Sequence, residues 1–531
     1  MNKILLYYHT IKYLKFQQIW YLIFGPVRKS ISRKIILNRR FRTQKTYPVK
    51  LAGWIAKPQS YTDKHFTFLT KEKMFHERVD WNYTEYGALW QYNLNYFDFL
   101  CQPNMSREEG LTLIFDFISQ MNQVKEGMDP YPISLRGINW IKFISMHKDF
   151  DYEDLKYIDQ ALYKQYLLLS KTTEVHLQGN HLLENGFSML FGAYYYRNNR
   201  FYNQADKILK QQLEEQILSD GAHFELSPMY HKIILERLLD CINLLQHNSF
   251  FNSERELYHL LVEKARIMLG WLDYMTFRNG QTPCVNDVPG YIASTPAISD
   301  YADRLNIQKA ENYSKQSGYR LIRKKNYELF FDMADVEASY QPGHTHADVF
   351  NFILHYKNKP IIVDTGVSTY ENNERRHIER ATVSHNTVVI DNKNNTQIWG
   401  AFRLGERPKV NKNKEEEGII EAEHNGYISM GLIHRRRLVF GESGVHISDQ
   451  ILGDKHYTAK AYIHFHPEIG SLMIQENNIV RVDDIFIRFN GSISNINHQY
   501  YYYAKGFNQL VQADCLVIEF KETLSTEIML N

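Results

Sequence analysis

Cysteine is scarce in this chain, and the cysteines that occur are far apart. Among 531 residues there are only four, Cys101, Cys241, Cys284 and Cys515, and no two form a CxxC pair. Such spacing disfavours both a disulfide framework and a zinc site built from thiolates. Any metal site would therefore have to use histidine and carboxylate ligands.

Long apolar runs are also lacking. No window approaches the roughly 20 apolar residues of a membrane span, so no transmembrane segment is expected. The apolar run before His9 is only Ile4-Leu5-Leu6-Tyr7-Tyr8, shorter than the core of a signal peptide, which is roughly 7 to 15 residues long. We therefore expect no standard secretion signal and favour a cytoplasmic over a periplasmic location in a bacterial cell.

The chain has no large excess of charge of one sign. Its net charge of +2 argues against a nucleic-acid binder that works by bulk electrostatics. One local basic run, from Arg28 to Arg42, is interpreted as a solvated helix, with contact to a membrane surface or an anionic partner as the alternative. An anionic substrate would need such a local patch.

Aromatic residues, in contrast, are plentiful, with 37 Tyr, 30 Phe and 7 Trp making up 14% of the chain. Aromatic rings can stack on sugars while their polar edges form hydrogen bonds, which suits a carbohydrate cleft. An aromatic core and a tyrosine-rich surface would explain the same composition, so this feature alone decides nothing.

The period of the apolar residues changes once along the chain. Between about residues 60 and 310 it is helical: Ser106 and Glu109 form a capping box ahead of a stripe at Leu111, Ile114, Phe115 and Ile118. From about residue 318 the period is two, with short β-rich runs such as 361–363, 387–390, 445–447 and 485–489. This pattern predicts a helical bundle or toroid followed by a β-sandwich. The charged segment Asn411 to Glu417 is expected to be an exposed turn.

The predicted organisation is a multidomain α+β protein in three parts. Residues 1–60 form an N-terminal basic and aromatic segment that packs on the toroid. Residues 61–312 form an (α/α) toroid, and residues 313–531 form an antiparallel β-sandwich. The oligomeric state is left open.

Histidines and carboxylates cluster at the start of the β-rich half. His344 and His346 would point to the same face if they lay in a strand, and Asp364 and His385 lie near the ends of later strands. Imidazoles and a carboxylate on neighbouring strand ends suit Zn²⁺. Hydrogen-bonded polar residues at strand ends would give the same pattern.

Two further polar segments lie in the helical half. In the first, Asn180 is followed by His181 and Glu184, which share one face of a helix. In the second, Tyr230 and His231 stand at a helix start. Each segment by itself is also explained by helix caps and core hydrogen bonds.

Taken together, these segments resemble the heparinase II/III family of polysaccharide lyases. The resembling pieces, in the family's order, are GNHLLENG from Gly179, DGAHFELSPMYH from Asp220, PGHTHAD from Pro342, VDTGVSTY from Val363 and SHNTVVID from Ser384. The family's fold, a helical toroid followed by an antiparallel β-sandwich, agrees with the change of period.

The resemblance implies a lyase that cleaves a glycan containing uronic acid, acidic and possibly sulfated like a glycosaminoglycan, by β-elimination. Asn180 and His181 match the positions that neutralise the C5 carboxylate. Tyr230 matches the general acid toward the leaving oxygen, which in some members is also the base, and His344 joins the acid/base set. A base role for Tyr230 would require nearby positive charge, because the unperturbed phenol pKa is near 10.

The resemblance also implies a metal site and substrate contacts. His346, Asp364 and His385 match the zinc ligands, with a structural role that fixes His344. Glu184 matches a position that supports the site. Arginine pairs suit carboxylates and sulfates, and aromatic rings suit sugars, so the further candidates for substrate binding are Tyr370, Arg375, Arg380 and Trp399.

Two other functions stay open. A uronate C5-epimerase shares the proton abstraction but returns a proton to the other face of the sugar. A non-catalytic glycan-binding protein could use the same scaffold, because a fold does not dictate function. The missing signal peptide favours a role beside machinery that builds or trims the cell's own acidic polysaccharide.

Overall fold

The structure is a computed structural model that describes residues 3–42, 44–147, 150–288, 293–311, 314–336 and 338–530. The predicted boundary between the second and third parts, at residues 312 and 313, lies outside the described residues. All four cysteines are free.

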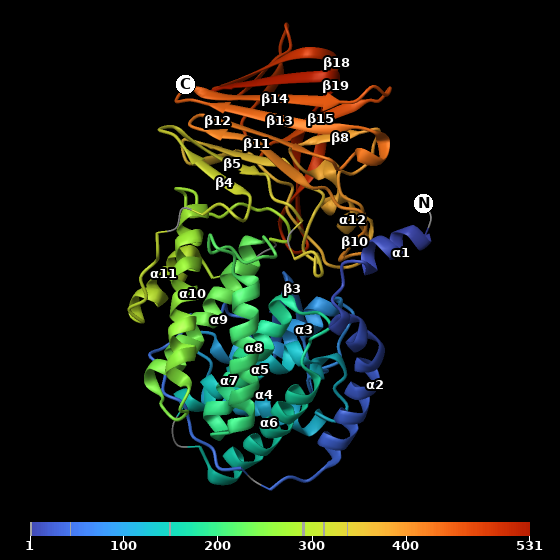
Figure 1. Cartoon of the computed structure of the whole chain (residues 1–531). Coiled ribbons are helices and arrows are strands. Elements are labelled where there is room, and N and C mark those ends of the chain that lie inside the picture. The colour runs from blue at the N-terminus through green and yellow to red at the C-terminus, as the bar shows by residue number, and fades with distance from the viewer. Residues whose placement is uncertain are drawn as a thin grey trace.

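The chain begins with two helices on the outside of the molecule. α1 (Lys3–Ile11) lies beside β10 (Arg403–Leu404) of the β half, and α2 (Phe16–Asn38) runs along the surface of the helical half and packs against α6 (Figure 1). A small antiparallel sheet follows, made of β1 (Tyr61–Thr62), β2 (His65–Phe68) and β3 (Lys71–Met74). This sheet interrupts the region that was predicted to be helical throughout.

Successive helices build the rest of the first half, as their apolar stripes predicted. They are α3 (Ala88–Tyr96), α4 (Arg107–Gln120), α5 (Pro130–Met146), α6 (Tyr152–Thr172), α7 (Gly179–Tyr196), α8 (Asn199–Gln216), α9 (Pro228–His247), α10 (Glu254–Met275) and α11 (Thr295–Arg304), with the 3-10 turns η1 (Asp98–Cys101) and η2 (Glu126–Met128). The Ser106 half of the predicted capping box is present at α4, where the Glu109 N–H donates to Ser106 Oγ at 3.2 Å, and the Glu109 carboxylate accepts from the Ser106 hydroxyl at 2.7 Å. Among the described residues, no helix combines the length and apolar character that a membrane crossing requires.

Two antiparallel sheets form the second half. The smaller has the order β4-β5-β6-β7 and consists of β4 (Tyr319–Arg323), β5 (Tyr327–Asp332), β6 (Phe352–Tyr356) and β7 (Lys359–Ile362). The larger has the path β11-β12-β13-β14-β19-β18-β17-β16, and β15 (Ala459–His464) joins it to β8 (Val388–Ile390). Its path strands are β11 (Val410–Glu416), β12 (Ile419–His424), β13 (Ile433–Phe440), β14 (Gly444–Leu452), β16 (Leu472–Ile474), β17 (Ile479–Val482), β18 (Ile485–Gly506) and β19 (Gln509–Met529).

Short elements lie between strands of the β half. They are α12 (Glu374–Arg380), the 3-10 turns η3 (Thr382–Ser384) and η4 (Ile428–Met430), and the strand pair β9 (Ile398–Trp399) and β10 (Arg403–Leu404). The segment Asn411 to Glu417 is a correction to the sequence-based expectation, because most of it belongs to β11. A charged strand at a sheet edge resembles a turn in sequence, since its side chains stay in solvent and charge blocks further strand pairing.

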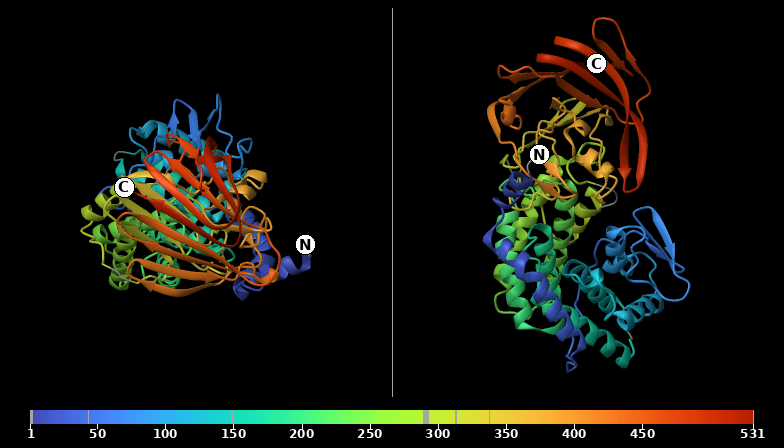
Figure 2. Two further views of the ribbon diagram at one scale, coloured as in Figure 1. Left: turned by 90° about the horizontal axis from the view of Figure 1, so that it is seen from above. Right: turned by 90° about the vertical axis from the view of Figure 1, so that its right-hand side faces the viewer.

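The smaller sheet is the middle layer of the molecule. Leu329 and Phe331 of β5 pack with the larger sheet in the sandwich core, whereas Phe330 between them packs with Trp271 and Met275 of α10. Because side chains alternate between the two faces of a strand, β5 is buried on both sides. The views in Figures 1 and 2 show the sheets stacked on one end of the helical half. This arrangement brings loops of the sandwich against the helices.

Candidate active site

A cleft of about 620 Å³ lies where the two halves meet. Its walls include Asn180, His181 and Tyr230 from the helical half and His344 and Tyr370 from the β half. The four residues predicted to be catalytic, and one of those predicted to bind substrate, therefore face a shared cavity although they span almost 200 positions of the sequence.

The start of α7 holds Asn180 in a fixed orientation. The backbone N–H of Asn180 donates to Glu225 Oε1 at 3.0 Å, and its side-chain Nδ2 donates to Glu225 Oε2 at 2.9 Å. Gly179 allows this approach, because its φ of +54° is a left-handed conformation and a side chain there would collide with Glu225. The sequence motif GNH thus places the amide of Asn180 at the cleft.

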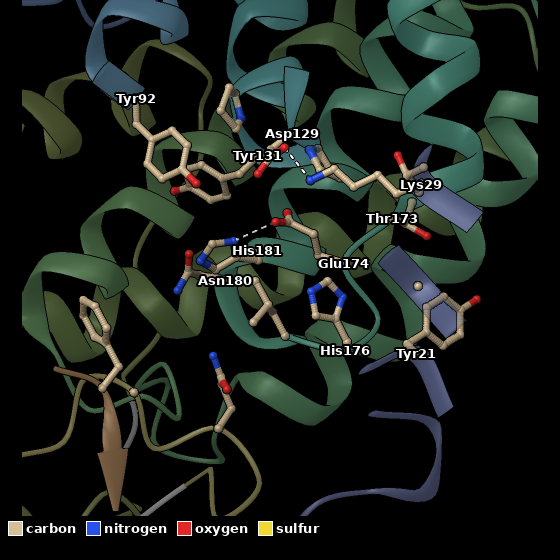
Figure 3. Close-up of a pocket in the computed structure, with 18 of the residues that line it drawn as sticks. Tyr21, Lys29, Tyr92, Asp129, Tyr131, Thr173, Glu174, His176, Asn180 and His181 are labelled. Carbon is tan, nitrogen blue, oxygen red and sulfur yellow. Dashed lines mark hydrogen bonds and ion pairs between the residues drawn. The ribbon is translucent and has the colours of Figure 1, made fainter. Parts of the chain in front are cut away.

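His181 is the next residue of α7 and pairs with a carboxylate. Its Nδ1 lies 3.2 Å from Glu174 Oε1, as the dashed line in Figure 3 shows. Burial would lower the pKa of His181, but the charge of Glu174 and its hydrogen bond outweigh burial, so the pKa is raised above 6.5. The ring also lies against Tyr131, with centroids 4.6 Å apart. This surrounding favours the imidazolium form of His181 more than water does.

Tyr230 lies in the first turn of α9, where Ser227 caps the helix by accepting the Tyr230 N–H. Its ring is 3.9 Å from the ring of His344, centroid to centroid, and its hydroxyl is 3.4 Å from that of Tyr370. Burial, followed by the neighbouring Tyr370 and the negative charge of Asp287, raises the pKa of Tyr230 well above 10. The residue is therefore a neutral phenol, which can donate a proton.

Asp287 connects the two halves of the site. It comes from the loop after α10, and its Oδ2 lies 2.8 Å from His344 Nδ1 while its Oδ1 lies 2.9 Å from His346 Nε2. Arg376 of α12 donates to the same carboxylate from both terminal nitrogens, at 2.5 and 2.8 Å. Because Asp287 accepts from Nδ1, Nε2 is the ring nitrogen of His344 left for other partners, and it lies 3.9 Å from Glu225 Oε2.

Sequence reasoning did not single out the three carboxylates that orient the site. Glu225 stands inside the quoted motif DGAHFELSPMYH, five residues before Tyr230, and could have been found there. Glu174 and Asp287 lie outside every quoted motif. One signal could have indicated these carboxylates, namely that each predicted cation needs a carboxylate partner.

Two family models match this chain. Models describing the heparinase II/III N-terminus and the heparinase II/III-like C-terminal region match residues 133–309 and 307–529. The chain belongs to the heparinase II/III family. Together the two models include Asn180, His181, Tyr230, His344 and Tyr370, but not the part of the cleft wall that α2 and α3 supply.

Two curated proteins show detectable identity to the chain. A heparin-sulfate lyase from Bacteroides stercoris is 23% identical over 307 residues, which cover 52% of this chain and 44% of that protein. A heparin-sulfate lyase from Pedobacter heparinus is 24% identical over 246 residues, covering 41% and 37% respectively. The matches thus span less than half the length of either relative.

Solved structures confirm the predicted fold class, a helical toroid followed by an antiparallel β-sandwich. A heparinase III structure superimposes with a TM-score of 0.67 at 14% identity, covering 95% of this chain and 89% of that one. Heparan sulfate lyase HepC from Pedobacter heparinus gives 0.58 at 16% identity, covering 95% and 88%.

Four residues predicted to bind substrate lie elsewhere in this heparinase II/III fold. The Glu184 side chain has no exposed area and lies 3.4 Å from Arg237, and burial raises its pKa to about 7. Trp399 contacts the N-terminal helix, where its Nε1 donates to Thr10 Oγ1 at 3.1 Å. Glu184 thus supports α7 on the side that faces away from the cleft, and Trp399 holds α1 in place.

The two predicted arginines serve the loops of the β half. Arg375 pairs with Glu379 at 2.8 Å and donates to the Tyr502 carbonyl. Arg380 is fully buried and donates to the carbonyls of Gly400 and Thr345. Sequence alone could not separate these structural arginines from cleft residues, because both kinds need oxygen partners.

The segment that carries His344 and His346 is a loop and not a strand. The two rings nevertheless reach a common partner, because the loop folds over Asp287. Their common contact thus comes from Asp287, and strand alternation plays no part in it.

The predicted zinc ligands lie close together behind the cleft. His385 Nδ1 is 2.7 Å from Asp364 Oδ2, and the rings of His346 and His385 are 5.5 Å apart. His346 Nδ1 and His385 Nε2 are buried and lack a hydrogen-bond partner in the described structure. Among the described residues no group of three or more His, Cys, Asp or Glu side chains has the arrangement of a metal site. Zinc stays a prediction, supported by the two unsatisfied imidazole nitrogens.

Proposed function

We propose that this heparinase II/III family member is a polysaccharide lyase that cleaves a glycan containing uronic acid by β-elimination. The observation that carries the proposal is the meeting of Asn180, His181, Tyr230 and His344 at one cleft. The curated relatives named above are heparin-sulfate lyases, which supports an acidic, sulfated glycosaminoglycan as the substrate class.

The first requirement of the reaction is to neutralise charge on the uronate. The C5 proton is weakly acidic because the adjacent carboxylate is already negative, and abstraction adds charge to that group. His181, as an imidazolium paired with Glu174, supplies a cation there. The Asn180 amide nitrogen lies 3.2 and 2.9 Å from the two Glu225 oxygens and has two hydrogens, so turning one of them from Glu225 would make it available to the same carboxylate. Fixed donors of this kind stabilise developing negative charge.

The second requirement is a base and an acid. His344 Nε2 accepts the C5 proton, because Asp287 holds the opposite nitrogen. The C4–O4 bond then breaks as the C4–C5 double bond forms, and the Tyr230 hydroxyl protonates the departing O4. The neutral phenol suits this role, and the 3.9 Å ring contact keeps acid and base on one side of the sugar.

Substrate contacts are assigned to residues that line the cleft. Tyr370 offers a ring and a hydroxyl beside Tyr230. Arg28 of α2 and Lys171 of α6 line the cleft and are exposed, so they provide the positive charge that an acidic glycan requires. These cations take the place of Arg375 and Arg380 in the proposal.

Zinc, if bound, would be held by the free nitrogens of His346 and His385, with Asp364 beside them. Its role would be structural, because it would cross-link the loops that carry these residues. No catalytic step passes through it. We expect purified protein to contain close to one zinc per chain and to melt at a lower temperature after chelation. His385→Ala should abolish the metal content. Metal-free protein with unchanged melting would refute the assignment.

Incubation with a panel of polysaccharides that contain uronic acid tests the activity itself. Elimination creates a double bond conjugated to the carboxylate, so ultraviolet absorbance should rise with at least one substrate. An epimerase would change the sugar without new absorbance, and a binding protein would leave it unchanged.

A further inference from the structure

The apolar face of the N-terminal helix α2 is turned toward solvent. A helix that only packs on a globular body would bury this face. Large apolar side chains lie on its outer face, between 48% and 78% exposed. They are Phe16, Trp20, Ile23, Phe24, Val27, Ile31 and Ile35. The spacing of three, four and one keeps all seven within one stripe of the helix surface, defined here as the outer stripe.

The opposite face of α2 is engaged by the protein. Gln18 donates to the backbone carbonyls of His176 and Tyr340, at 3.1 and 3.3 Å. Lys29 pairs with Asp129 (Figure 3), and Arg33 donates to the Val124 carbonyl. The orientation of the helix is therefore fixed by polar contacts, and its outer stripe is held toward solvent.

Positive charge accompanies the outer stripe. The first 62 residues contain thirteen of the 62 Lys and Arg residues of the chain and none of its 60 Asp and Glu residues. Lys34, Arg39 and Arg40 are exposed at the C-terminal end of α2, and within the described residues none of the three forms an ion pair with a carboxylate. The remainder of the chain is correspondingly acidic, so the asymmetry is local.

We propose that the outer stripe of α2 docks on the surface of an anionic lipid bilayer. Apolar and aromatic side chains beside lysine and arginine are the composition of helices that lie in the membrane interface. Association with a second copy would bring two strongly positive segments together, whereas anionic headgroups complement them. Charge complementarity thus favours lipid over self-association.

Docking would also set the position of the cleft. Tyr21, Leu22 and Gly25, on the inner side of α2, line the cleft, so one helix separates the cleft from the lipid surface. The cleft would open beside the membrane, where an acidic polysaccharide emerging from the bilayer is accessible. The docking itself does not depend on the proposed lyase activity.

Sedimentation of the full chain with lipid vesicles tests this inference. Binding is expected to vesicles of phosphatidylcholine with phosphatidylglycerol, to weaken with salt, and to be much weaker with phosphatidylcholine alone. The variant Trp20→Ser/Ile23→Ser/Ile31→Ser should lose binding. Lys34→Ser/Arg39→Ser/Arg40→Ser should lower the partition coefficient about fivefold per charge, on the order of a hundredfold in all.

The matched control is Met473→Ser/Ile474→Ser, which removes apolar side chains of similar exposure from β16 and should bind like wild type. Thermal melting shows whether each variant is folded, and the wild-type comparison of the two lipids needs no variant. Absence of binding to anionic vesicles would overturn the inference. So would a wild-type dimer in light scattering that the outer-stripe variant converts to a monomer.

Discussion

At the scale of single residues, the proposed chemistry depends on which form each side chain takes in the cleft. Tyr230 is a neutral phenol because burial and nearby negative charge raise its pKa well above 10. This agrees with a general acid. The base role that some family members give to the tyrosine is not favoured, since burial and the negative charge of Asp287 disfavour a phenolate, and the proposal gives that role to His344.

Tyr230→Phe tests the acid. The ring and its contact with His344 remain, but the proton for the leaving oxygen is lost, so kcat should fall by about 10² to 10⁴ with little change in KM. Steady-state kinetics on the best substrate of the panel measure both constants. Tyr500→Phe, which removes a hydroxyl from an exposed tyrosine of β18 outside the cleft, should retain activity. Full activity of Tyr230→Phe would eliminate this acid assignment.

Glu174→Gln tests the charge on His181. Because Glu174 raises the pKa of His181 above 6.5, the imidazolium is present below that pKa and is lost as the pH rises through it. Activity should therefore fall on the basic side of the pH profile. With Glu174 neutral, burial prevails and the basic limb should move to lower pH by about one to three units.

The pH dependence of kcat/KM measures this shift. Glu256→Gln, a change at an exposed carboxylate of α10, is the control and should leave the profile in place. An unmoved basic limb in Glu174→Gln would show that His181 does not act through its charge.

Single residues also show how far the sequence alone could go. Motifs that resembled the family placed Asn180, His181, Tyr230 and His344 correctly at a cleft. They could not distinguish these from Glu184, which shares the GNHLLENG motif but points away from the cleft. The partner carboxylates were missed because contacts such as that of His344 with Asp287 join residues 57 positions apart.

At the scale of elements, the start of α7 positions Asn180 and His181, the residues proposed to bind the uronate carboxylate. The backbone takes positive φ at Gln178 and Gly179 before it enters the helix. This turn lets Glu225 bind both the backbone and the side chain of Asn180. The spacing of its apolar residues could predict the helix α7, but the turn before α7 has no such regular spacing.

Gly179→Ala tests this turn. The new methyl group would displace Glu225 and release Asn180, so activity should fall sharply and stability should drop by about 1 to 2 kcal/mol. Gly280→Ala is the matched control, because Gly280 also has positive φ, +83°, but open space where the side chain would go. It should show the conformational cost alone, with activity retained. Equal activity losses in the two variants would contradict the role of Glu225.

Other elements show what periodicity missed. β11 was expected to be a turn because its residues are charged, and β1 to β3 are short enough to be hidden between helical stripes. α2 was recognised as a basic helix, yet periodicity could not reveal that its apolar stripe faces outward. The direction of a face depends on packing, which a single sequence does not contain.

At the scale of the whole molecule, the active site exists only where the halves join. Asp287 from the helical side binds His344 and Arg376 from the β side, and both members of the Asp287–Arg376 pair are fully buried. Removal of one partner leaves a buried charge without compensation. The same contact therefore joins the halves and orients the base.

Arg376→Ala should lower the free energy of unfolding by about 3 to 5 kcal/mol, measured by chemical denaturation. Arg488→Ala, which breaks the exposed ion pair with Glu527, should cost about 1 kcal/mol or less. Similar losses in both variants would argue against Asp287 as the link between the halves.

The central claim is that this cleft performs β-elimination, and product structure tests it most directly. Mass spectrometry and NMR of oligosaccharides released from the best uronate substrate should show a C4–C5 double bond at the new non-reducing end. The ultraviolet absorbance should rise in proportion, and Tyr230→Phe should suppress both signals. Saturated ends that have gained a water molecule, or an inverted C5 without chain cleavage, would contradict the assignment.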